Sequence, residues 1–193
     1  MWSALTLVTA FSELPVTVAE AKVQCRVDYA DDDVLIEQLI RTAAAMIDGP
    51  DGIGHCITPQ TWKLTLDCWQ SPIVIPLGPV ASVTNIKYLD SDGVEQTLDS
   101  ALYRFVTGVR PAFIERAYGA SWPAHRAVSA PIAVTFVAGV AAANVDAGLK
   151  HLVLLLVGHL YQNREATDEA GMSDEIALSA RHLIERFRVG RFA

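Results

Sequence analysis

The spacing of hydrophobic residues changes twice along the chain. Up to residue 57 apolar residues recur at helical intervals, between residues 58 and 140 they alternate with polar ones in short runs, and after residue 140 the helical interval returns. A period near 3.6 indicates an amphipathic helix, whereas a period of two indicates a half-buried strand. The pattern predicts an α+β fold, in which a helical bundle from the N- and C-terminal segments holds an inserted small antiparallel β domain, sandwich or barrel-like.

Residues 1–57 are expected to form an N-terminal arm and two helices. Thr17 and Glu20 have the spacing of a capping box, which starts a short helix that ends near Arg26. The run of Asp31, Asp32 and Asp33 suits the exposed N–H groups that open a helix. The second helix would bury a stripe made of Ile36, Ile40, Ala43 and Ile47.

Residues 58–140 are expected to form the β domain. Short apolar runs alternate with turn residues such as Gly78-Pro79, Asp92-Gly93 and Trp122-Pro123. Several short strands at this spacing are typical of a small barrel or sandwich. The expected strands cover residues 62–68, 73–75, 83–89, 102–106, 113–114 and 132–137.

Residues 141–193 are expected to form two helices and a basic tail that pack with residues 16–48. The first helix spans residues 145–165, an acidic loop covers residues 166–174, and a last helix carries the stripe Ile176, Ala180, Leu183, Ile184 and Phe187. The most apolar run, residues 152–160, is much shorter than the ~20 residues that cross a bilayer. It predicts a buried core helix, and no membrane association is expected.

The composition is that of a folded domain: 51% of the 193 residues are hydrophobic and 19% are charged. The odd number of cysteines, Cys25, Cys56 and Cys68, excludes a fully paired disulfide framework and fits a reducing compartment. No cation precedes the apolar N-terminal stretch before Lys22, so a signal peptide for export is not expected.

Motifs that resemble catalytic or metal sites have simpler interpretations. Asp90-x-Asp92-Gly93 lacks the remaining ligands of a calcium loop and predicts a hairpin turn. His151 and His159 share one helix face without a metal-binding motif, so they are interpreted as core or interface residues. No catalytic residue, metal site or cofactor is predicted, and the chain is not expected to be an enzyme.

Charge is distributed unevenly along the chain, whose net charge is −7. Residues 1–60 carry nine acidic and three basic residues, whereas residues 181–193 carry four arginines and one glutamate. A net acidic chain is unlike proteins that grip duplex DNA through its phosphates. The basic, aromatic C-terminus has two interpretations, a docking peptide or a solvated helix end that complements the helix dipole.

A series of short motifs in a fixed order resembles a phage family. The motifs are Val18-Ala19-Glu20-Ala21-Lys22 with Arg26-Val27-Asp28, Asp31-Asp32-Asp33, Thr61-Trp62-Lys63-Leu64, Pro76-Leu77-Gly78-Pro79-Val80, Tyr88-Leu89-Asp90-Ser91-Asp92-Gly93, Trp122-Pro123, Phe136-Val137-Ala138-Gly139, and His159-Leu160-Tyr161-Gln162-Asn163-Arg164-Glu165. Together, from about residue 16 to residue 188, they resemble the head–tail connector, or adaptor, proteins of long-tailed double-stranded DNA phages and of phage-derived gene transfer agents.

The resemblance implies a structural protein of the virion neck, assembled in the host cytoplasm. Such proteins form a ring, commonly of twelve subunits, that binds the portal protein on one side and a stopper or other tail-side neck protein on the other. DNA passes through the ring without specific binding. The family has no catalytic residues, so none carries over.

The resemblance suggests three hypotheses about sites. The first is that the acidic N-terminal third lines or rims the channel, because a conduit for DNA is better acidic or neutral than basic. The second is that the basic C-terminal segment docks into the portal, where its arginines pair with carboxylates. The third is that the β domain faces the tail-side partner or the outside of the neck, with the exposed turns at Asp92-Gly93 and Gly108 as its contacts. The proposed channel-facing residues are Asp28, Asp31, Asp32 and Asp33, and the proposed portal-docking residues are Arg181, Arg186, Phe187, Arg188, Arg191 and Phe192.

Two alternatives are kept. The first is another neck component, such as a stopper or a tail terminator; those proteins are usually mostly β, so the two helical ends argue against it. The second is a small soluble enzyme or ligand-binding domain with the same helix–strand–helix order, which would need a concave polar pocket and titratable groups with shifted pKa values.

Overall fold

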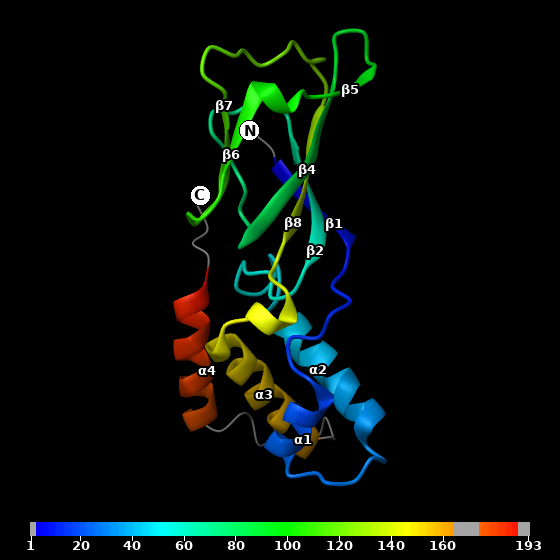
Figure 1. The fold of residues 1–193 in the computed structure, drawn as a ribbon, viewed down its shortest axis with the longest axis vertical. Coiled ribbons are helices and arrows are strands. Elements are labelled where there is room, and N and C mark those ends of the chain that lie inside the picture. Colours follow the sequence, from blue (N-terminus) through cyan, green and yellow to red (C-terminus); the bar gives the residue numbers. More distant parts are fainter. Residues whose placement is uncertain (1–2, 164–173, 189–193) are drawn as a thin grey trace. The chain divides into compact units, whose positions relative to one another are not determined.

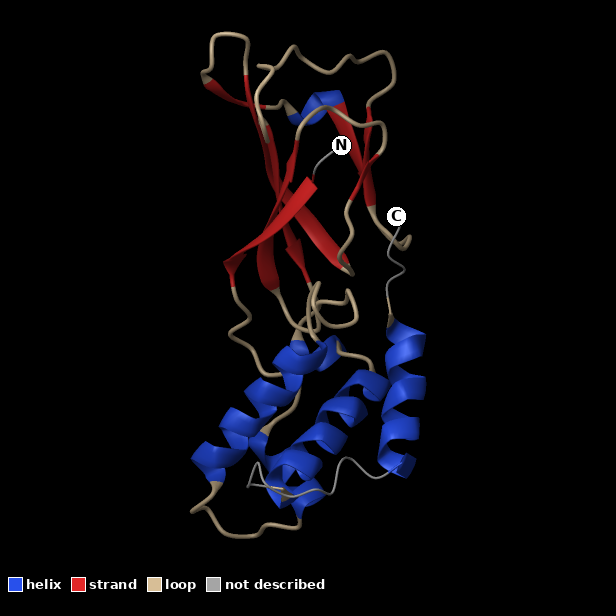
Figure 2. Ribbon diagram, turned by 180° about the vertical axis from the view of Figure 1, so that it is seen from behind, coloured by secondary structure: helices blue, strands red, loops and turns tan. Residues whose placement is uncertain are grey.

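The computed structural model describes residues 3–163 and 174–188. The chain folds into two compact units, each assembled from separate parts of the sequence. A β unit contains residues 3–12 and 59–139, and a helical unit contains the described residues of 13–58 and 140–188. Figure 2 shows this division, with the strands in one unit and the α-helices in the other.

The β unit contains two open antiparallel sheets (Figure 1). The larger sheet has five strands in the order β1-β2-β8-β4-β5, and the smaller has three in the order β3-β7-β6. The strands of the larger sheet are β1 (Ser3–Thr9), β2 (Gln60–Leu66), β8 (Ile132–Ala138), β4 (Val80–Leu89) and β5 (Glu95–Thr97). Those of the smaller sheet are β3 (Ile73–Val74), β7 (Phe113–Arg116) and β6 (Tyr103–Val106), which follows a 3-10 turn at Ser100–Leu102.

The two central strands carry the alternation that the sequence shows. In β2 and β8 every second residue is buried, from Gln60 to Leu66 and from Ile132 to Ala138. Antiparallel pairing places Leu64 opposite Val134 and Trp62 opposite Phe136, so the buried side chains of both strands lie on one face. This face forms the core of the unit.

The helical unit contains four α-helices and a 3-10 turn at Ala142–Asn144. They are α1 (Val18–Cys25), α2 (Asp33–Ile47), α3 (Ala147–Gln162) and α4 (Asp174–Phe187). The predicted capping box is present at α1: the Glu20 backbone N–H donates to Thr17 Oγ1 over 3.1 Å, and the Thr17 N–H donates to Glu20 Oε2 over 2.7 Å. The hydrogen bonds from Thr17 lower the pKa of the Glu20 carboxyl.

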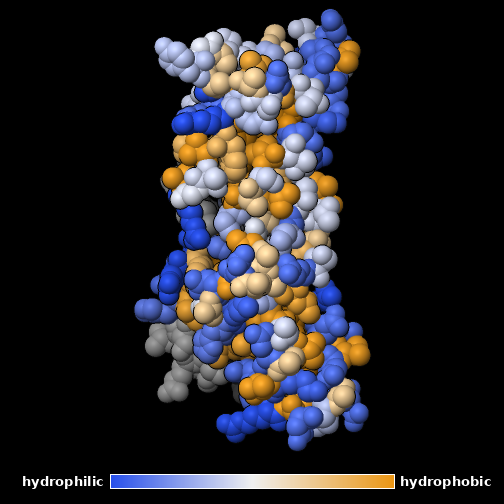
Figure 3. All heavy atoms as spheres, in the orientation of Figure 1, coloured by the Kyte–Doolittle hydropathy of each residue, from blue (hydrophilic) through white to orange (hydrophobic). Residues whose placement is uncertain are grey.

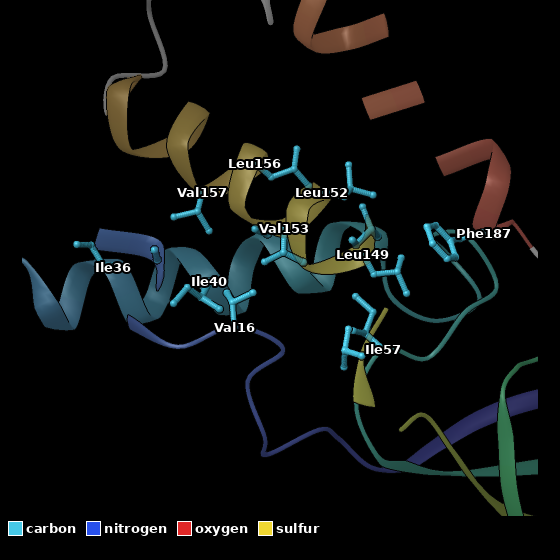
Figure 4. Close-up of a cluster of buried hydrophobic side chains, with 14 of the residues drawn as sticks. Val16, Ile36, Ile40, Ile57, Leu149, Leu152, Val153, Leu156, Val157 and Phe187 are labelled. Atoms are coloured by element: carbon cyan, nitrogen blue, oxygen red, sulfur yellow. The ribbon is translucent and has the colours of Figure 1, made fainter. Parts of the chain in front are cut away.

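The core of the helical unit joins all four helices (Figure 4). The predicted stripe of α2 is buried, and α3 buries a broad face, as its apolar sequence predicts. Phe187, from the last turn of α4, reaches toward Leu149 of α3 (Figure 4). The core residues on α3 are Leu149, Leu152, Val153, Leu156 and Val157.

The structure corrects the predicted fold in three respects. The β unit consists of open sheets and not of a closed barrel or a clear sandwich. Two strands, β1 and β5, were not predicted, so residues 3–9 of the expected arm belong to the larger sheet. The helix expected over residues 145–165 begins at Ala147 and ends at Gln162.

Two predictions about the sequence are confirmed, and one lies outside the described residues. Residues 152–160 belong to a core helix, and no helix within residues 3–163 or 174–188 has the length and apolar character needed to span a membrane. The three cysteines are free thiols; Cys56 is buried and the other two are partly exposed. Most of the expected acidic loop, residues 166–173, is not described.

Candidate functional site

The C-terminal end of α4 combines a buried aromatic residue with exposed arginines. The side chain of Phe187 is only 6% exposed. It meets the ring of buried His55 edge-on, with 6.1 Å between the ring centroids. A Cβ built on Gly148 would lie 3.1 Å from the Phe187 ring, so the ring packs directly against the start of α3. Phe187 therefore packs α4 against α3 within this chain, and its contact with the portal stays a prediction.

The arginines around Phe187 point to the surface. Arg181, Arg186 and Arg188 are exposed, and none of them forms an ion pair within the described parts of the chain. The guanidinium carbon of Arg186 lies over the Phe187 ring, 5.3 Å from its centroid, which is a cation–π contact. Arg191 and Phe192, the other two predicted docking residues, lie outside the described residues.

The acidic residues before α2 differ in what they contact. The Asp32 carboxylate accepts hydrogen bonds from the hydroxyl of Tyr161, on the last turn of α3, and from that of Tyr29 over 3.3 Å. The hydrogen bond to Asp32, supported by the Tyr29 hydroxyl, raises the pKa of Tyr161 well above its usual value. Asp32 thus ties the start of α2 to the end of α3.

The neighbouring aspartates also differ in whether their carboxylates have a partner in the helical unit or face solvent. Asp33 Oδ1 forms a salt bridge with Lys22 Nζ over 2.7 Å, which links α2 to α1. Asp28 and Asp31 are exposed. Of the four residues proposed to face the channel, Asp32 and Asp33 are therefore engaged inside the unit, and Asp28 and Asp31 are the two whose charges face solvent.

The turn after β4 is the hairpin that the sequence predicts. Gly93 adopts a φ of +86°, a conformation that favours glycine. Asp90 Oδ1 accepts hydrogen bonds from the backbone N–H groups of Asp92, over 3.0 Å, and Val94, over 2.9 Å. A hydrogen bond from Gln96, together with these, lowers the pKa of Asp90. The carboxylate stabilises the turn, and the turn tip is exposed.

An aromatic cluster that the sequence did not reveal holds the segment between β7 and β8. The indoles of Trp69 and Trp122 stack with 4.8 Å between centroids and 11° between planes. Trp69 Nε1 donates to the Pro123 carbonyl over 2.8 Å, and the edge of the Tyr88 ring meets Trp69. The only sequence signal was the presence of two tryptophans near turns, fifty residues apart, which does not show that they meet.

Features of an enzyme site are weak in the described residues. No group of three or more His, Cys, Asp or Glu side chains there could hold a metal ion. A surface cavity of about 240 Å³ lies between residues 77–80 and 107–112. It is smaller than typical ligand pockets, and Arg110 is the single charged residue of its lining. His151 is exposed, and His159 Nδ1 lies 3.1 Å from the side-chain amide of Asn163.

The acidic excess of the chain belongs to one unit. The segments that make up the helical unit, residues 13–58 and 140–188, contain sixteen acidic and eight basic residues, whereas residues 59–139 contain six of each and residues 3–12 none. On the face shown in Figure 3, hydrophobic residues reach the surface among the hydrophilic ones.

Comparison with known proteins identifies similar solved structures. The chain matches no protein-family model and no curated protein. It is 27% identical to a chain in the virion of a native gene transfer agent particle, covering 98% of this chain and 97% of that one, with a TM-score of 0.77. It is 26% identical to chains in two neck structures with the same coverage: an empty particle computed with C6 symmetry (TM-score 0.77) and a native particle computed with C12 symmetry (TM-score 0.76).

These likenesses extend over both units, because they cover nearly the full length of each chain. An identity above a quarter combined with a common fold throughout relates this chain to the neck proteins by more than architecture. The findings therefore support a structural protein of the gene transfer agent neck, and they assign the chain to the neck of the virion.

Proposed function

We propose that the chain is a head–tail connector, or adaptor, that forms a ring beneath the portal and joins it to the tail-side neck proteins. The observation that carries the proposal is the match along 98% of the chain to a neck structure computed with C12 symmetry. Neck structures with C6 and C12 symmetry indicate a homo-oligomeric ring, and we propose twelve subunits here. The role is structural and without catalysis, and it requires no cofactor.

The exposed arginines of α4 are the proposed contact with the portal. Arg181, Arg186 and Arg188 can each donate charge-assisted hydrogen bonds to carboxylates, and Phe187 fixes the helix end that carries them. Arg191 and Phe192 complete the proposed docking segment beyond the described residues.

The portal contact is tested by variants that spare the core. Arg181→Glu with Arg188→Glu, and separately the removal of residues 189–193, should each weaken attachment to filled heads at least about tenfold, because losing one partner of an interfacial charge pair costs about 2–5 kcal/mol. Co-sedimentation with heads measures attachment. Arg126→Glu, at an exposed arginine of the β unit, is the matched control. Normal attachment of both variants would contradict the proposed docking segment.

The second part of the proposal concerns DNA passage. Asp28 and Asp31 are exposed in the acidic helical unit, and we propose that they line or rim the channel. Fixed negative charge repels the phosphates and keeps the duplex from adhering. Replacing both residues by lysine should slow DNA delivery from otherwise normal particles, whereas Asp51→Lys, at another exposed aspartate of the unit, should not. A lumen ringed by lysine or arginine in an imaged particle would contradict this part.

The alternative is another component of the neck, such as a stopper or a tail terminator. The helical unit makes up about half of the described residues, which favours a connector over those mostly β proteins. Imaging of particles that carry a tagged chain distinguishes the two: a connector lies next to the portal, and a stopper or terminator lies further toward the tail. Turnover of a small molecule by the pure protein would instead indicate an enzyme.

A further inference from the structure

Two stretches of the larger sheet have an open edge. β1 is the outermost strand on one side, and its residues pair with β2 alone (Figure 1). On the other side, β5 covers β4 only from Lys87 to Leu89. Within residues 81–85 of β4, Ser82, Val83 and Asn85 pair with β8, and no described strand lies along the other side of this stretch. Such edges present unpaired backbone N–H and C=O groups.

Neither open stretch is protected by charge or by proline. Neither residues 3–9 (SALTLVT) nor residues 81–85 (ASVTN) contain a charged residue or a proline. In β1, Leu7 is 44% exposed and Val8 is 55% exposed. Bulges leave Ala81 and Thr84 of β4 outside the pairing with β8, which adds unpaired backbone groups to that edge. An uncharged edge such as that of β1, with exposed apolar side chains, tends to aggregate unless another strand covers it.

The directions of the strands allow the β1 edge of one copy to pair with the β4 edge of a second copy. Each step from β1 through β2 and β8 to β4 is antiparallel, so β1 and β4 run in opposite directions. A second copy in the same orientation therefore brings its β4 edge alongside β1 as an antiparallel neighbour, the pairing used throughout the sheet. Because the two edges differ, the contact is heterologous and can repeat around a closed ring.

We propose that β1 of one subunit pairs with residues 81–85 of β4 in the next subunit, so that the larger sheets of neighbouring subunits join. The inference rests on the ring of the proposed function. The occupant is a second copy because the two edges match in direction and in lack of charge, and because the similar neck structures have C12 and C6 symmetry. Strand addition at an edge supplies affinity through the main chain.

Cysteine pairs test the contact directly. Leu7→Cys is combined in turn with Ala81→Cys, Ser82→Cys and Thr84→Cys, all at exposed positions. Opposed residues of an antiparallel pair have Cβ atoms about 4.5–5.5 Å apart, close to disulfide geometry, so three partners sample the register. After mild oxidation of assembled particles, a non-reducing gel should show a ladder of covalent multimers for at least one pair. The parent chain, with its three native cysteines, gives the background.

Each other outcome has a defined meaning. Dimers from Leu7→Cys alone would show β1 paired with β1 around a two-fold axis and would overturn the proposal. No ladder from any pair, in particles whose images contain the ring, would overturn the strand contact and leave the connector function standing. A chain missing from the neck in those images would overturn the connector function as well.

A charge placed on the edge gives an independent readout. Val8→Lys should lower the fraction of chains found in rings about tenfold, because lysine is a residue that blocks strand addition at sheet edges. Val128→Lys, at a valine that is 42% exposed, is the matched control. Circular dichroism and the unfolding midpoint verify that both variants fold. Rings formed equally well by folded Val8→Lys and by Val128→Lys would contradict the proposal.

Discussion

Phe187 is the residue whose removal best separates the packing of α4 from its proposed contact with the portal. Its side chain is only 6% exposed, and its ring contacts the start of α3 and the ring of His55. Replacing a buried phenylalanine by alanine usually costs about 3–5 kcal/mol. A buried phenylalanine removes roughly 150–200 Å² of apolar surface from water, and each Å² contributes about 25 cal/mol. Their product, about 4–5 kcal/mol, is similar to that cost.

The loss of unfolding free energy in Phe187→Ala is limited by the packing of α4. Among the described helices, α4 packs on α3, so the loss of Phe187 can release α4 before the rest of the unit unfolds. We therefore expect Phe187→Ala to lower the unfolding free energy by about 3 kcal/mol, the lower end of the usual range. Amide hydrogen exchange along residues 181–188 should accelerate, while exchange in α2 changes little.

Attachment to heads should follow the loss of packing. Phe187→Ala should weaken attachment because the arginines of α4 are no longer held, whereas Phe187→Leu, which keeps most of the buried volume, should attach nearly normally. Urea unfolding and hydrogen exchange measure the first effect, and co-sedimentation with heads measures the second. If Phe187→Ala attaches poorly but unfolds and exchanges like the parent chain, the ring is accessible to a partner and the structural role assigned to it is wrong.

Three further predictions concern stability. Thr17→Ala should cost about 1 kcal/mol in urea unfolding and Thr17→Ser much less, because serine keeps the cap; equal losses would contradict the capping role. The hydrogen bond to Asp32 raises the pKa of Tyr161 and stabilises the fold fully below the unfolded-state pKa of about 10. This stabilisation is lost as the pH rises toward the folded-state pKa, so the melting temperature should fall less in Tyr161→Phe than in the parent chain over an alkaline pH series. Equal falls in the two chains would rule out this hydrogen bond as the cause. Gly52→Ala should destabilise by about 1–3 kcal/mol, since its Cβ would lie 2.2 Å from the Ile47 carbonyl oxygen; an unchanged midpoint would show that the loop adjusts freely.

The helices and central strands could be predicted because their signals are local. Thr17 and Glu20 fix the start of α1 through their own hydrogen bonds, and the four apolar residues of the α2 stripe have helical spacing. The two unpredicted strands lack such signals. β1 is apolar on both sides and pairs with residues more than fifty positions away, and all three residues of β5 are exposed.

The candidate surfaces could be predicted only as regions of charge. The sequence shows a run of aspartates before α2 and a group of arginines near the C-terminus, but it does not show which charges are engaged. Asp33 is paired with Lys22 and Asp32 with Tyr161, a residue 129 positions away. The position of Phe187 in the helical stripe of α4 indicates burial, and its position among the arginines places it in the proposed docking segment.

The interleaved order of the two units has a consequence for synthesis of the protein. The chain passes between the units after residues 12, 58 and 139, so neither unit is complete until distant segments have been made. β1 leaves the ribosome before its partner β2, some fifty residues later, and at about 5–20 residues per second this delay lasts roughly 3–10 s. A nascent strand with no charge is vulnerable during that delay, and we expect cotranslational chaperones that hold apolar segments to raise the yield of folded protein.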